Sequence, residues 1–74
     1  MENYRDYDND SNITAYESGE DYILIKFKDG SKYLYTYASA GMNNIEQMKT
    51  LADRGDGLNA FISHNRPRYA SKSN

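Results

Sequence analysis

Residues 22 to 37 read YILIKFKDGSKYLYTY, and this stretch decides the fold. Its two halves are rich in β-branched and aromatic residues, which is typical of β-strands. Asp29-Gly30 lies between the halves and is typical of a tight turn. The stretch therefore predicts an antiparallel β-hairpin.

The register of this hairpin depends on the length of its turn. A two-residue turn at Asp29-Gly30 would direct the tyrosines of the second half away from the aliphatic residues of the first half. A three-residue turn over residues 28–30, with Gly30 at positive φ, would place Ile25 opposite Tyr33. Because a buried face fixes the register of a strand pair, we expect the three-residue turn and one shared aliphatic and tyrosine face.

The flanking residues extend the hairpin into an α+β domain. Residues 12–16 alternate weakly, which predicts a first strand with Ile13 and Ala15 on one side. Apolar residues recur at helical spacing over residues 45–52 and again over residues 58–62. The sequence thus predicts a small antiparallel β-meander of about three strands, followed by two short helices packed on one face.

Several residues are candidates for helix ends. Ser39 or Asn43 could cap the first helix, and Asp56 could cap the second. Gly55 is a suitable stop for the first helix. Pro67 disfavours helical geometry at the residue before it, so the second helix should end near residue 64 or 65.

The expected core comes from the inner face of the hairpin and from the apolar stripes of both helices. Its members are Ile13, Ile23, Ile25, Phe27, Tyr33, Tyr35, Ile45, Met48, Leu51, Ala52, Leu58, Phe61 and Ile62. We also expect Tyr69 to fold back onto the body of the domain.

Charge divides the chain unevenly. Residues 1–21 carry seven acidic side chains and one basic, whereas residues 22–74 carry eight basic and four acidic. We expect a disordered acidic tail over residues 1–10, a folded domain over residues 11–70 and a second disordered tail over residues 71–74. The acidic tail could fold over the basic surface and weaken binding there.

Composition restricts the location of the chain. No apolar run reaches the roughly 18 residues needed to cross a bilayer, and the polar N-terminus does not resemble a secretory signal. Cysteine is absent, so neither disulfides nor thiolate metal sites are available. We therefore expect a cytoplasmic location without membrane association.

The ordered set of motifs resembles the KTSC domain, a short domain found at the C-terminus of some lysyl-tRNA synthetases and as stand-alone bacterial and phage proteins. The resemblance covers roughly residues 11 to 70. It rests on Ile23-x-Ile25-x-Phe27, Asp29-Gly30, Tyr33-Leu34-Tyr35, Leu51-Ala52, Gly57-Leu58-Asn59-Ala60-Phe61-Ile62 and Tyr69. It implies the α+β fold and, from the synthetase context, RNA binding. It implies no catalytic residues.

The leading function hypothesis is a non-catalytic module that binds RNA or single-stranded nucleic acid. Lysines on the outer face of the hairpin and arginines near the C-terminus could contact phosphates, and an outward tyrosine could stack on a base. The residues expected to make contact are Tyr22, Lys26, Lys32, Arg66 and Arg68. Tyr33 and Tyr35 could also form a stacking platform, although the expected register makes them core residues.

The alternative hypothesis is a protein-interaction or homodimerisation module. Leu24 and Leu34 should lie together on the outer face, which is unusual for a fully solvated surface. That face and the exposed strand edge could bind a partner or a second copy of the chain. It could also be covered by the first strand or by a tail.

Catalysis and metal binding have little support in the sequence. There is one histidine and no cysteine, and no carboxylate pair occupies an evident cleft. We therefore expect no enzyme activity, no cofactor, no metal and no small-molecule substrate. Residues 6–17 partly match the ligand spacing of a calcium loop, but Ser11 stands where that loop needs glycine.

Overall fold

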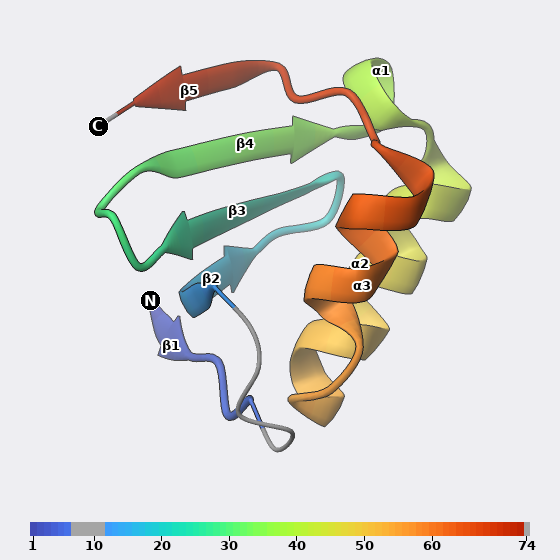
Figure 1. The fold of residues 1–74 in the computed structure, drawn as a ribbon. Coiled ribbons are helices and arrows are strands. Elements are labelled where there is room, and N and C mark those ends of the chain that lie inside the picture. Colours follow the sequence, from blue (N-terminus) through green and yellow to red (C-terminus); the bar gives the residue numbers. More distant parts are fainter. Residues whose placement is uncertain (7–11, 74) are drawn as a thin grey trace.

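The computed structural model describes residues 1–6 and 12–73. Within them, five antiparallel strands form one sheet in chain order, and three helices follow the fourth strand (Figure 1). The elements are β1 (Glu2–Asn3), β2 (Ile13–Ser18), β3 (Tyr22–Phe27), β4 (Lys32–Thr36), α1 (Tyr37–Ala40), α2 (Met42–Arg54), α3 (Leu58–Asn65) and β5 (Ser71–Ser73). The α+β class is confirmed, with more strands and one more helix than predicted.

The β3–β4 hairpin has the register that the sequence predicts. Ile25 pairs with Tyr33 and Ile23 pairs with Tyr35. The Phe27 N–H donates to the Ser31 carbonyl at 2.9 Å, which closes a three-residue turn. Gly30 has a φ of 91°, a conformation that glycine adopts at little cost.

Strand β2 differs from the expected alternation because it contains a β-bulge. Ile13 lies opposite Phe27 while Ala15 lies opposite Lys26, so one extra residue is inserted between them. The bulge places Tyr16, rather than Ala15, on the inner face with Ile13. The expectation that Ile13 and Ala15 share one side is therefore wrong.

The helices begin at different residues from those expected. Thr36 caps α1, where its Oγ1 accepts from the Ser39 N–H at 3.1 Å and its N–H donates to the Ser39 Oγ at 3.0 Å. Gly41, with a φ of 91°, separates α1 from α2. Asn43 lies inside α2 and does not cap it. Gly55 ends α2 in the left-handed conformation, as predicted.

Helix α3 begins at Leu58 after Gly57, without a side-chain cap from Asp56. Instead, the Tyr4 hydroxyl accepts a hydrogen bond from the Leu58 N–H at 3.2 Å. A residue distant in sequence thus satisfies one of the free backbone donors at the helix N-terminus. The helix ends at Asn65, two residues before Pro67, as predicted.

The two predicted tails are partly ordered. Glu2–Asn3 pairs with β2, and Tyr4 is buried in the core. Ser71–Ser73 pairs with β4. The expectation of disorder is therefore wrong for these residues, because backbone pairing orders polar segments that lack any hydrophobic pattern. Residues 7–10 and 74 lie outside the described residues.

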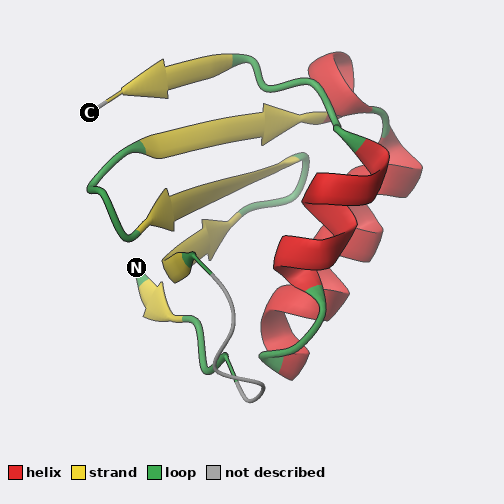
Figure 2. Ribbon diagram, viewed as in Figure 1, coloured by secondary structure: helices red, strands yellow, loops and turns green. Residues whose placement is uncertain are grey.

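The core lies between the inner face of the sheet and the helices, which Figure 2 shows on one side of the sheet. Ile23, Ile25, Ile45, Met48 and Leu58 are fully buried. Every residue of the expected core is either buried or packed against this cluster. The sequence did not predict that Tyr4 and Tyr16 belong to it.

Candidate functional site

The turn of the β3–β4 hairpin is held rigidly by one carboxylate. Asp29 Oδ1 accepts hydrogen bonds from the Ser31 N–H at 2.9 Å and from the Ser31 Oγ at 2.6 Å. These two hydrogen bonds lower the pKa of Asp29. Ser31 is itself buried, so the turn has a fixed shape from which the neighbouring lysines project.

Four lysines gather around this turn, and we call them the hairpin-end lysines: Lys26, Lys28, Lys32 and Lys72. Lys26 and Lys32 are direct partners across the β3–β4 ladder, on the sheet face opposite the helices. Like charges directly opposite one another destabilise a strand pair. Asp29 supplies one negative charge at the same end.

Lys72 lies on the other face of the sheet. It pairs with Tyr33 across β4 and β5, and its Nζ lies 5.3 Å from the centroid of the Tyr33 ring. A hydrogen bond with Tyr33 is the main cause that raises the pKa of Lys72. The ammonium group is therefore charged at neutral pH, and the hairpin end presents cations on both faces.

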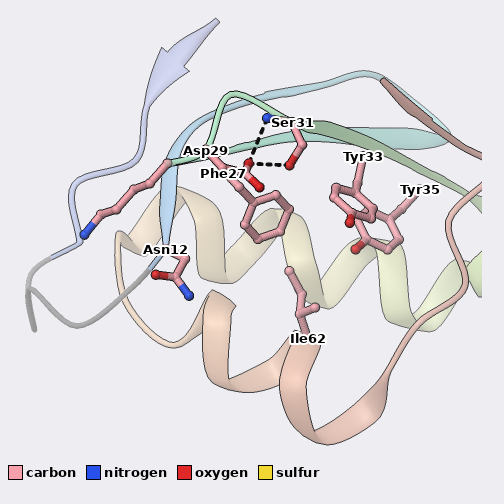
Figure 3. Close-up of a pocket in the computed structure, with 8 residues that line it drawn as sticks. Asn12, Phe27, Asp29, Ser31, Tyr33, Tyr35 and Ile62 are labelled. Atoms are coloured by element: carbon pink, nitrogen blue, oxygen red, sulfur yellow. Dashed lines mark hydrogen bonds between the residues drawn. The ribbon is translucent and has the colours of Figure 1, made fainter. Parts of the chain in front are cut away.

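A cavity of about 450 Å³ opens beneath the hairpin end, between the sheet and α3. Figure 3 shows the side chains that line it. They are Asn12, Phe27, Lys28, Asp29, Ser31, Tyr33, Tyr35 and Ile62. Pockets that bind small molecules commonly enclose roughly 300 to 1,000 Å³, so this cavity is at the small end of that range.

Aromatic rings form most of the apolar wall. Phe27 and Tyr33 meet edge to face with centroids 5.1 Å apart, and Tyr33 and Tyr35 are roughly parallel at 6.4 Å. Tyr69 folds back, as predicted, and meets the Tyr33 ring edge to face at 4.9 Å. Burial is the main cause that raises the pKa of Tyr35 to about 12, so its hydroxyl remains protonated.

The residues predicted to contact nucleic acid fall into separate groups. Lys26 and Lys32 lie together at the hairpin end. Tyr22 pairs with Thr36 at the opposite end of β3, about 13 Å from Lys26 at the usual rise of an extended strand. Its hydroxyl donates to Glu17 at 3.3 Å and its ring packs against Gly19. Tyr22 therefore cannot share a small ligand with the lysines.

Arg66 and Arg68 lie in a third region, the segment that connects α3 to β5. Arg66 ends α3 with a φ of 47°, and the Arg68 carbonyl accepts from the Ser39 Oγ at 2.8 Å. Both arginines are exposed. Because Ser39 follows the end of β4, Arg68 lies near the end of the sheet remote from the turn. The structure does not bring these arginines to the lysines.

Tyr33 and Tyr35 face the helices rather than open solvent. Tyr35 is only 3% exposed, and Tyr33 is half-buried. This result agrees with the expected register and excludes a flat stacking platform on the open side of the sheet. Both rings line the cavity between the sheet and α3.

The leucines of the alternative hypothesis lie where the sequence placed them. Leu24 and Leu34 pair directly on the sheet face opposite the helices, and both are half-buried. The short strands β1 and β5 now form the edges of the described sheet, so the long edges of β2 and β4 are partly occupied. The strand edge is thus less available than the sequence suggested.

Sequence reasoning missed the cavity and the polar residues at its rim. Asn12 and Ser31 are polar residues at the starts of predicted strands, and only the folded chain brings them near Ile62. A polar pair also joins Tyr16 to Asp53 of α2 at 2.9 Å. That pair is structural, because the Tyr16 ring is buried in the core.

Among residues 1–6 and 12–73, no three acidic or histidine side chains are grouped so that they could hold a metal ion. Residues 7–11 of the possible calcium loop, which include Asp8 and Asp10, lie outside the described residues. None of the described helices combines the length and the apolar character needed to span a bilayer.

Comparison of the chain with known protein families, with curated proteins and with solved structures found no significant match. The hairpin-end lysines and the adjoining aromatic cavity are therefore the features from which a function can be argued.

Proposed function

We propose that the chain is a small non-catalytic module that binds RNA or other single-stranded nucleic acid through its hairpin end. The observation that carries this proposal is the direct pairing of Lys26 with Lys32. The pair costs stability, and a row of phosphates would relieve the repulsion. Lys28 in the turn adds a third cation beside them.

The chemistry of the ligand follows from the neighbouring residues. Lysines bind phosphates as point charges, without the fixed two-pronged geometry of an arginine side chain. This mode of binding suits recognition of a sugar-phosphate backbone without sequence preference. The aromatic wall lies on the other face of the sheet, next to Lys28 of the turn, and suits bases that are free of a duplex. The resemblance to the KTSC domain, with its synthetase context, supports the same ligand class. The net charge of −2 favours modest affinity.

A salt titration with matched variants tests the proposal. Fluorescence anisotropy would measure the affinity for a labelled oligouridine at salt concentrations from about 50 to about 200 mM. The double variant Lys26→Gln/Lys32→Gln should bind more weakly. Its plot of log affinity against log salt concentration should be shallower, with a slope smaller in magnitude by roughly 1.4.

The double variant Arg66→Gln/Arg68→Gln is the control, because it removes the same charge from the other end of the molecule. It should retain most of the affinity and the original slope. Equal losses in both double variants would show that net charge, rather than the hairpin end, drives binding. A wild-type protein that fails to bind at low salt would refute the proposal.

A second candidate function is self-association through the outer sheet face, and the Leu24–Leu34 pair favours it. In that case sedimentation velocity should show a dimer whose population rises with protein concentration and is insensitive to salt. The variant Leu34→Lys should then be monomeric. A monomer at every concentration would rule this candidate out.

A further inference from the structure

The cavity beneath the hairpin end has the character of a site for one flat ring. Its wall is formed by Phe27, Tyr33 and Tyr35 on the strand side and by Ile62 on α3 (Figure 3). Base-aromatic stacking is tolerant of sequence because every base has a π face. Its volume of about 450 Å³ suits a single base and its sugar rather than a folded segment.

Polar groups at the rim can meet the edge of such a ring. Figure 3 shows the Asn12 amide directed toward the space between the hairpin and α3. An amide offers both donors and an acceptor, which matches the mixed pattern along the edge of a base. The Tyr35 hydroxyl is protonated at neutral pH and can donate a hydrogen bond, and burial raises its pKa further, to about 12.

Cations flank the same space. Lys28 lines the cavity on the turn side. Lys72 lies over Tyr33, with its Nζ 5.3 Å from the ring centroid. An uncharged aromatic ligand would gain little from these two ammonium groups, whereas the phosphate attached to a nucleoside would be attracted by both.

We propose that this cavity holds one base of a bound single strand, while Lys28 and Lys72 contact the adjacent phosphates. This inference rests on the proposed function and adds a specific base-binding position to it. The strand passes around the hairpin turn, from the outer lysines Lys26 and Lys32 to the inner cavity. An aromatic side chain from a partner protein is the competing occupant.

Two ligand pairs separate the base from its phosphate. In the first pair, the affinity of the wild-type protein for an oligouridine is compared with its affinity for an abasic oligomer of the same length. The base-containing strand should bind at least about five-fold more tightly, as expected for one stacked base. In the second, NMR titration with uridine 5′-monophosphate should shift the Tyr33, Tyr35 and Ile62 signals, and ribose 5-phosphate should shift them far less.

Two variants locate the effect. Ile62→Phe narrows the cavity, and Asn12→Ala removes the rim amide at an exposed position with little risk to folding. Both variants should lower the ratio of the affinity for the oligouridine to the affinity for the abasic oligomer toward one. The affinity for the abasic oligomer itself should not change. Unaltered circular dichroism would confirm that Ile62→Phe is folded.

The outcomes distinguish this inference from the proposed function. Equal binding of the two oligomers, with no shifts from the nucleotide, would leave phosphate binding intact and overturn the base site. Nucleotide shifts at the cavity without any oligomer binding would support the base site and overturn the proposed function. Shifts caused only by a tyrosine-containing peptide would instead favour a protein partner and overturn the inference.

Discussion

Replacing Tyr4 with phenylalanine would test how the N-terminal segment is anchored. The substitution keeps the ring, which is 6% exposed, and removes only the hydroxyl that accepts from the Leu58 N–H at 3.2 Å. A buried donor left without its partner costs about 1 to 3 kcal/mol. Because this bond is long for its type, we expect a loss of about 1 to 2 kcal/mol in the free energy of unfolding.

Each kcal/mol lowers the melting temperature of a domain this small by roughly 4 to 8 °C. Urea and thermal denaturation, followed by circular dichroism, would measure the loss. Hydrogen exchange at the Leu58 amide should accelerate, since its acceptor is gone. The control is Tyr69→Phe, at a ring that is 51% exposed and should change stability little. Unchanged stability and unchanged exchange at Leu58 in Tyr4→Phe would refute the anchoring of α3 by the N-terminal segment.

Other predictions concern the turn and the first helix cap, and urea denaturation measures each of them. Gly30→Ala should cost about 1 to 2 kcal/mol of folding stability because φ is positive there. Nothing lies within 4 Å of the added Cβ, so the cost comes from the backbone conformation and not from a steric clash. Gly30→Asn should lose less stability, because asparagine tolerates positive φ better than alanine. An Asp29→Asn variant should be less stable than wild type at neutral pH. The pKa of Asp29 is lowered in the folded state, so its contribution is present above the unfolded pKa of about 3.9 and disappears as the pH falls through the folded value. If the stability difference between wild type and Asp29→Asn stays constant below about pH 4, which is near the unfolded pKa, this assignment is contradicted. Thr36→Ala should cost about 1 kcal/mol through loss of the α1 cap, and an equally large loss in Asn43→Ala would argue against Thr36 as the cap.

The hairpin was predictable because its residues satisfy one strong constraint. Alternation in both strands and glycine in the turn allow only one register that buries the aliphatic and tyrosine rows together, and the structure has that register. The helical stripes and the stop at Gly55 were predictable for the same reason, since local pattern and burial agree.

Features that depend on contacts between distant residues were not predictable. The bulge in β2 reverses the expected alternation around Ala15, and nothing in residues 12–16 marks it. Thr36 forms the cap where Ser39 or Asn43 was expected, because β4 ends at Thr36 and the helical segment begins earlier than the apolar pattern suggests. Tyr4 lies in a polar segment and becomes part of the core only through its contact with α3.

The candidate site was predicted in part. The outward position of Lys26 and Lys32 follows directly from the register. Their separation from Arg66 and Arg68 does not, because it depends on where the chain after α3 returns to the sheet. The cavity was also beyond prediction, since α3 supplies one of its walls.

Chemical-shift mapping with a single-stranded oligonucleotide at low salt tests the central claim most directly. The claim is that the lysines around the β3–β4 turn form the contact surface. The largest amide shifts should fall on residues 26–32 and on Lys72 in β5. Shifts centred on Arg66 and Arg68, or the absence of shifts anywhere in the chain, would contradict it.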